Sequence, residues 1–320
     1  MTIHAMEAIQ DAFCDLRSGV RLCYRTYGPD DGEPLLLIAG MTLQLTFWPP
    51  ALIRALIQCG YRVIVFDNRD VGRSSRTPRP GPSVLQQFLR RPVKDGYDLE
   101  DMAQDTIGLL DSLQVARAHV VGMSMGGMIG QVLAARYPQR VLSLTSIIST
   151  TGARKVGQPA MSSMLMLTAP PPRTREAAVE QYSRIMAHIG TQGYPADDVA
   201  RRAYAAQAWD RGQQARDHES TTRQIGAIIN SGDRTDELRR IQVPTLVVHG
   251  DRDLLVAPSG GVATAAAIAG ADMVMVRGMG HDIPDGVVPL LTSLIDGHIR
   301  RRAIRATAEP VPVRAGRHIA

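Results

Sequence analysis

A chain of 320 residues is long enough for one large α/β unit or for two smaller domains, and its 44% hydrophobic and 21% charged residues exclude a disordered or fibrous protein. The net charge of +5 does not mark a nucleic-acid-binding face, because residues 300–320 alone contain six arginines and one glutamate. The rest of the chain is close to neutral, so nucleic acid is not an expected partner.

The cysteines and the first residues bear on where the protein is found. Cys14, Cys23 and Cys59 are too few and too unevenly spaced for a disulfide framework or a metal knuckle, which fits a reducing compartment. Residues 1–17 lack the charged and apolar segments of a signal peptide, and no uncharged apolar stretch reaches the length of a membrane span. We therefore expect a cytoplasmic protein without membrane insertion and without a metal.

From residue 12 to 150, short apolar runs alternate with amphipathic segments, a pattern typical of strands and crossover helices in a mostly parallel α/β sheet. Residues 12–17 and 20–27, separated by Ser18 and Gly19, predict a hairpin at one edge of this sheet. Further strands are expected over 35–39, 63–66, 118–121 and 141–148, and helices over 49–59, 99–113 and 125–137.

The alternation stops after residue 150. Residues 153–235 are rich in Ala, Arg, Gln and Met, contain three consecutive prolines between two apparent helices, and include no convincing strand. Strands resume over 244–249 and 272–276, and helices are expected near 258–270 and 286–302. The predicted organisation is a core of residues 1–150 and 237–302, a helical cap of residues 151–236, and a basic flexible tail of residues 303–320.

The segment around Ser124 predicts a nucleophile. An apolar strand runs into Gly122-Met123-Ser124-Met125-Gly126, and a helix follows. In such a strand-to-helix turn, side chains two residues before and two after the serine would clash, so glycine at both places allows the serine hydroxyl to stand clear. The start of the helix then stabilises negative charge beside it.

A nucleophilic serine needs a histidine base and an acid that orients it, and in this type of turn the chain order is serine, acid, histidine. His281 follows the last predicted strand, so we assign it as general base and acid. Asp251 and Asp253 both follow the strand before it. We favour Asp253, because Asp251 stands directly after Gly250 and suits a turn in which it bonds its own backbone.

Acyl transfer also needs two donors for the oxyanion that forms. The backbone N–H of Met125 is expected to be one donor, and that of Met41, after a turn at Gly40, the other. Gly40 is also a candidate residue of the substrate pocket, and Trp48 either lines this pocket or packs at the start of a helix. Met164, in a Met-rich stretch of the insertion, suits an adaptable apolar pocket, although such a stretch more often packs a cap helix.

These motifs resemble those of the α/β-hydrolase superfamily, over nearly all of residues 20–300. The segment 66–74, Phe-Asp-Asn-Arg-Asp-Val-Gly-Arg-Ser, resembles the superfamily's turn after a strand, residues 121–126 its nucleophile elbow, and residues 278–281 its histidine loop. Together they are similar to the bacterial branch that includes aclacinomycin methylesterase and related carboxylesterases. The resemblance supports Asp253, since family members place the acid three residues after the glycine that ends the strand, and it implies a cofactor-free hydrolase with a helical cap.

The expected reaction is hydrolysis of small to medium, largely apolar carboxylic esters through an acyl-enzyme on a Ser-His-Asp triad. Where many relatives have His-Gly, this chain has Ala39-Gly40, which argues against bulky tertiary-alcohol esters. Other interpretations stay open. One is a C–C bond hydrolase, lactonase or perhydrolase on the same fold, because Ser124-Met125-Gly126-Gly127 also resembles the elbow of ring-cleavage-product hydrolases. Another is a small-ligand receptor without turnover.

Overall fold

The computed structural model describes residues 10–167, 170–212 and 217–307. In these ranges the strands form one eight-stranded sheet in the order β1-β2-β4-β3-β5-β6-β7-β8. The hairpin of β1 and β2 lies at one edge of the sheet. Its two strands pair antiparallel with each other, β2 also pairs antiparallel with β4, and all other neighbouring strands are parallel. The strands are β1 (Ala12–Asp15), β2 (Arg21–Tyr27), β3 (Glu33–Ile38), β4 (Tyr61–Phe66), β5 (Ala118–Met123), β6 (Val141–Ile147), β7 (Thr245–Gly250) and β8 (Asp272–Val276).

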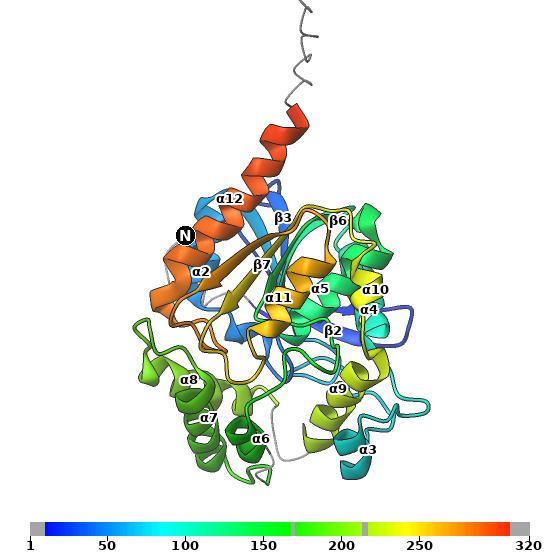
Figure 1. Cartoon of the computed structure of the whole chain (residues 1–320), viewed down its shortest axis with the longest axis vertical. Helices are drawn as coiled ribbons and strands as arrows, with labels where there is room; N and C mark the ends of the chain where they lie inside the picture. The colour runs from blue at the N-terminus through cyan, green and yellow to red at the C-terminus, as the bar shows by residue number, and fades with distance from the viewer. Residues whose placement is uncertain (1–9, 168–169, 213–216, 308–320) are drawn as a thin grey trace, which may run out of the picture.

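Helices cover both faces of this sheet (Figure 1). Successive strand residues point to opposite faces, so Leu35 and Leu37 pack in the core cluster with α2 and α12, while Leu36 and Ile38 pack in the cluster with α4 and α5. Because each central strand is buried on both sides, its sequence is mostly apolar rather than alternating. The helices of the core are α2 (Pro50–Gln58), α4 (Leu99–Ser112), α5 (Met125–Arg136), α11 (Ser259–Ala267) and α12 (Val288–Thr307), with short 3₁₀ turns η1 (Leu45–Phe47), η2 (Pro138–Arg140) and η3 (Asp285–Val287).

The segment between β6 and β7 contains helices and no strand in its described residues, as the sequence predicts. They are α6 (Met161–Leu167), α7 (Arg175–Ile189), α8 (Asp198–Asp210), α9 (Asp217–Ser231) and α10 (Thr235–Leu238). We call residues 151–236 the insertion. Figure 1 shows α6, α7 and α8 grouped at one end of the molecule, with α9 beside the additional helix α3 (Val84–Leu89). The sequence pattern did not predict α3, whose apolar side chains are exposed and therefore show no inward-facing periodicity.

The last helix is longer than predicted. It was expected to end at residue 302, but α12 continues to Thr307, so the first five residues of the predicted flexible tail are helical. The reason is that no helix-breaking residue occurs between Gly297 and Pro310. Residues 308–320 lie outside the described part of the chain.

The other expectations about composition concern cysteines, membranes and metals. All three cysteines are free thiols. In the described ranges, no helix is long and apolar enough to cross a bilayer. The same ranges hold no group of three or more His, Cys, Asp or Glu side chains arranged to bind a metal ion.

Candidate active site

Ser124 lies at the turn between β5 and α5, near the middle of the sheet. Its backbone has φ 54° and ψ −120°, a conformation that few non-glycine residues adopt. The turn is tight, since a Cβ on Gly122 would lie 2.2 Å from the Gly126 carbonyl oxygen, and one on Gly126 would lie 2.0 Å from the Ile38 carbonyl oxygen. Glycine is therefore required at both places, as the sequence motif predicts.

A second serine supports this turn. The Ser149 hydroxyl, just after β6, donates to the Ser124 carbonyl oxygen at 2.8 Å. The same carbonyl accepts the Met128 N–H, the first hydrogen bond within α5, at 3.1 Å. The earlier N–H groups of α5 cannot bond within the helix, so the positive end of the helix faces the region around Ser124.

The structure brings Ser124, His281 and Asp253 into one hydrogen-bonded chain. His281 Nε2 lies 3.0 Å from Ser124 Oγ, and His281 Nδ1 lies 2.7 Å from Asp253 Oδ2. Asp253 is buried, and its other carboxylate oxygen, Oδ1, accepts the N–H groups of Leu255 and Val256, each at 2.8 Å. These bonds fix the carboxylate, so one of its oxygens stays directed at the imidazole.

Asp251 has another role than the predicted one. Its side chain does not turn back on its own backbone but accepts the Gly278 N–H at 2.6 Å, across to the loop after β8. The two loops meet because β7 and β8 are parallel neighbours and end at the same edge. Asp251 thus ties the loop of the acid to the loop that carries His281.

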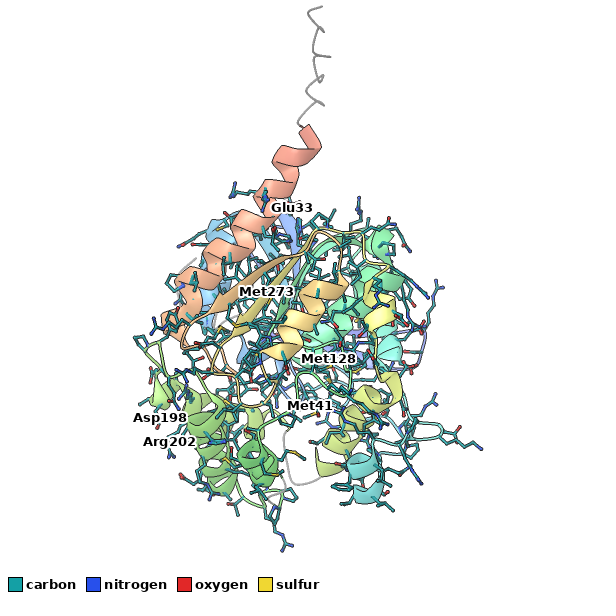
Figure 2. All side chains as sticks on the ribbon, in the orientation of Figure 1. Glu33, Met41, Met128, Asp198, Arg202 and Met273 are labelled. Carbon is teal, nitrogen blue, oxygen red and sulfur yellow. The ribbon has the colours of Figure 1, made fainter. Side chains whose placement is uncertain are left out.

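The two expected oxyanion donors, Met125 and Met41, lie after β5 and after β3 in the fold. Met125 is the first residue of α5, so its N–H lacks a partner within the helix. Gly40 lies against the nucleophile, and a Cβ built on it would lie 3.3 Å from the Ser124 Cβ. The positive φ of this loop, however, belongs to Thr42, at 63°, and not to Gly40. Figure 2 shows Met41 where the core meets the helices of the insertion.

The two remaining pocket residues lie in different surroundings. Trp48 is 1% exposed, belongs to the core cluster around β3 and α2, and meets Phe47 edge to face, so its packing role is the better supported. Met164 lies on α6 with 44% of its surface exposed. No contact joins either side chain to Ser124 in the described structure, and their place in a pocket stays a prediction.

Three buried groups around the site were not found by sequence reasoning. Asp67, after β4, accepts the N–H groups of Leu45 at 2.7 Å and Arg73 at 2.9 Å, and it pairs with Arg211 at 3.2 Å. Burial raises the pKa of Asp67, against the opposing charge of Arg211. Asn68 Nδ2, next to it, lies 3.3 Å from the carbonyl oxygen of Ala39.

The third group is His249, within β7. Its Nε2 donates to the Val256 carbonyl at 2.8 Å and lies 3.6 Å from Asp253 Oδ2, while Nδ1 has no partner in the described structure. Burial lowers the pKa of His249, so it is neutral and holds the acid loop through a single N–H. Its position inside a strand gave no sequence signal, because a histidine in an apolar strand is most often a core residue.

Comparison with protein families agrees with this fold. The model of the α/β hydrolase fold matches residues 33–285, so the chain belongs to the α/β-hydrolase family, and it is a hydrolase. Among its relatives are rhodomycin D methylesterases. The chain is 33% identical to that of Streptomyces sp. strain C5 over 299 residues, which are 87% of this chain and 94% of that protein. It is 31% identical over 300 residues to that of Streptomyces peucetius, with the same coverage.

Solved structures share the architecture at lower identity. An enol-lactonase from Burkholderia xenovorans LB400 is 24% identical, with a TM-score of 0.69 over 90% of this chain and 100% of that one. A meta-cleavage product hydrolase from Pseudomonas fluorescens IP01 is 19% identical, with a TM-score of 0.70 over 91% and 97% of the two chains. At these identities the likeness supports the fold and not a substrate.

Proposed function

We propose that this protein hydrolyses carboxylic esters through an acyl-enzyme formed on Ser124. The observation that carries the proposal is the hydrogen-bonded chain from Ser124 Oγ through both nitrogens of His281 to Asp253. In this arrangement the imidazole can take the serine proton while the carboxylate holds it in the required tautomer.

The proposed reaction has two matching halves. Ser124 Oγ attacks the ester carbonyl as its proton passes to His281 Nε2, and the oxyanion is bound by the N–H groups of Met125 and Met41. When the tetrahedral intermediate collapses, His281 returns the proton to the departing alcohol, which leaves an acyl group on Ser124. Water then gives its proton to His281 and attacks this ester, so that the acid is released and the serine restored.

The names of the relatives support a small alcohol on the proposed substrate. Both methylesterases are aligned over 94% of their length, and they are named for removing a methyl group from an ester. We therefore propose methyl or similarly small alkyl esters of an apolar acid. We also propose that the insertion acts as a cap over the site and so selects the acid.

The first test is labelling with a fluorophosphonate probe, followed by mapping of the modified peptide. We expect the label on Ser124 and its loss in His281→Ala. Ser124→Ala should lower the turnover of short p-nitrophenyl and methyl esters by about 10⁴-fold or more while the protein stays folded. A folded wild-type protein that takes no label, or undiminished turnover in Ser124→Ala, would contradict the proposal.

A further inference from the structure

The loop after β3 contains a strained residue next to the proposed oxyanion donor. We call residues 40–44 the oxyanion loop. Thr42, directly after Met41, has φ 63°, in the left-handed region that non-glycine residues seldom enter. Such a conformation is unfavourable for a residue with a Cβ and persists only where the surrounding structure holds it. The contacts of Thr42 therefore decide how the peptide groups on either side of it are oriented.

The side chain of Gln224, on α9 of the insertion, supplies such a contact. Its Oε1 accepts the Thr42 N–H at 2.8 Å, and its Nε2 donates to the Arg69 carbonyl at 3.0 Å. The Gln224 side chain is fully buried, so losing either partner would leave a buried polar atom without a hydrogen bond. Gln224 thus bridges the loop after β3 to the loop after β4.

This bond has a consequence for the choice of donor. Because the Thr42 N–H is bonded to Gln224 Oε1, it is not available to a substrate oxyanion. Met41, one residue earlier, is then the member of this turn whose N–H is placed to bind the oxyanion. Donors of an oxyanion hole act best when they are fixed before the charge forms. The bond from Gln224 fixes the Met41–Thr42 peptide group and so restricts the orientation of the Met41 N–H, one peptide group earlier.

The helix that carries Gln224 is itself firmly attached to the core. Arg223, the preceding residue, binds Asp70 through Nε at 3.0 Å and Nη2 at 2.8 Å, and both side chains are buried. At the other end of the oxyanion loop, Gln44 Nε2 donates to the Ala208 carbonyl of α8 at 2.8 Å. The loop is therefore held from two helices of the insertion.

We propose that Gln224 is a positioning residue that orients the Met41 N–H for the oxyanion, so that the insertion contributes to the rate of the chemical step as well as to substrate choice. The proposal rests on the proposed function above. Its effect is made through Thr42, and Gln224 itself does not touch the substrate.

The test compares Gln224→Met with the wild type on one ester. Methionine has a similar volume but makes neither bond, so we expect kcat to fall about 10–100-fold while KM changes less than about threefold. Binding of a trifluoromethyl ketone, which forms an oxyanion on Ser124, should weaken by a similar factor. Gln224→Asn keeps the amide but shortens its reach, so it should also lower kcat and weaken ketone binding. If Gln224→Met does not fold, the result for Gln224→Asn decides the test.

Asn230→Leu is the matched control on the same helix. Asn230 accepts the Val93 N–H at 2.7 Å and donates to the Tyr97 carbonyl at 3.1 Å, but it does not contact the oxyanion loop. We expect it to lower thermal stability while kcat and ketone binding stay at wild-type values. An unchanged kcat in folded Gln224 variants, or an equal loss in Asn230→Leu, would overturn the inference. If the fluorophosphonate probe labels Ser124 in the wild type, such a result overturns only the role of Gln224. If the wild type takes no label, the proposed function and this inference are overturned together.

Discussion

The tight turn at Ser124 is possible because the residues two positions before and two positions after it, Gly122 and Gly126, lack a Cβ. The closest approach is at Gly126, where an added Cβ would meet the carbonyl oxygen of Ile38 at 2.0 Å and that of Ala39 at 2.7 Å. Both neighbours are backbone atoms of the central strand β3 and its end, and they cannot move without disturbing the sheet. The turn can therefore form only if residue 126 is glycine, which has a hydrogen atom in place of a side chain.

Gly126→Ala should therefore be strongly destabilising. We expect a loss of about 3 kcal/mol or more in the free energy of unfolding, measured with urea, together with the loss of probe labelling at Ser124. The control is Gly297→Ala in α12, where an added Cβ meets nothing within 4 Å. That change should raise stability by about 0.5–1 kcal/mol, because alanine favours a helix. Equal effects of the two substitutions would refute the steric account.

The loop of residues 251–256 behaves as one element whose hydrogen bonds all serve to place Asp253. Its own carboxylate accepts the N–H groups of Leu255 and Val256, Asp251 joins it to the histidine loop, and His249 holds the Val256 carbonyl from beneath. His249 does this in the neutral state, since burial lowers its pKa. A second proton would have to enter at Nδ1, which has no acceptor in the described structure.

This gives a pH dependence with a definite sign. In the unfolded chain His249 takes up a proton below its ordinary pKa of about 6.5, but in the folded protein it does so only at lower pH. The unfolded state therefore binds more protons in that window, and stability falls as the pH drops below about 6.5. His249→Gln should show a shallower fall in urea stability between pH 7 and 5. His298, which is half-buried and whose pKa is also lowered by burial, contributes equally to both proteins, so identical slopes would contradict the prediction.

Across the whole molecule, the insertion is attached to the core by buried ion pairs and carries exposed ones on its outer side. Arg211, at the end of α8, reaches Asp67 at 3.2 Å and Asp11 at 2.8 Å, all with nearly buried side chains. By contrast, Asp198 and Arg202 lie on the outside of α8 (Figure 2). Exposed pairs of this kind contribute little to stability, whereas breaking a buried pair leaves an uncompensated charge.

Arg211→Met should accordingly lower the free energy of unfolding by about 3–5 kcal/mol at neutral pH. Asp67 would then have its pKa raised further by burial without the opposing charge, so the variant should regain stability as the pH falls and this carboxyl is protonated. Arg175→Met, which breaks an exposed pair with Asp210, should leave the urea midpoint unchanged. If both variants unfold at the same urea concentration, the buried pairs do not hold the insertion.

Sequence reasoning can predict those features of the fold and the candidate site whose determinant is local. The glycines around Ser124, the apolar run of β5 and the positions of Asp253 and His281 after their strands are patterns of a few neighbouring residues, and parallel strands bring such strand ends together. It failed where the determinant is a single long-range bond. Gln224 contacts Thr42 across 182 positions, and a polar residue in a helix carries no sign of such a partner. Asp251 shows the same limit. An aspartate directly after a strand can bond either its own backbone or a neighbouring loop, and the sequence does not distinguish the two.

The order of the site residues along the chain also has a consequence in time. Ser124 and His281 are 157 positions apart, with the insertion between them. A ribosome adding roughly 5–20 residues per second needs about 8–30 s to make this stretch. During that interval the nascent polypeptide contains Ser124 but not yet His281, the base proposed to activate it. On the proposed mechanism, Ser124 therefore stays unreactive until the last part of the chain has been synthesised.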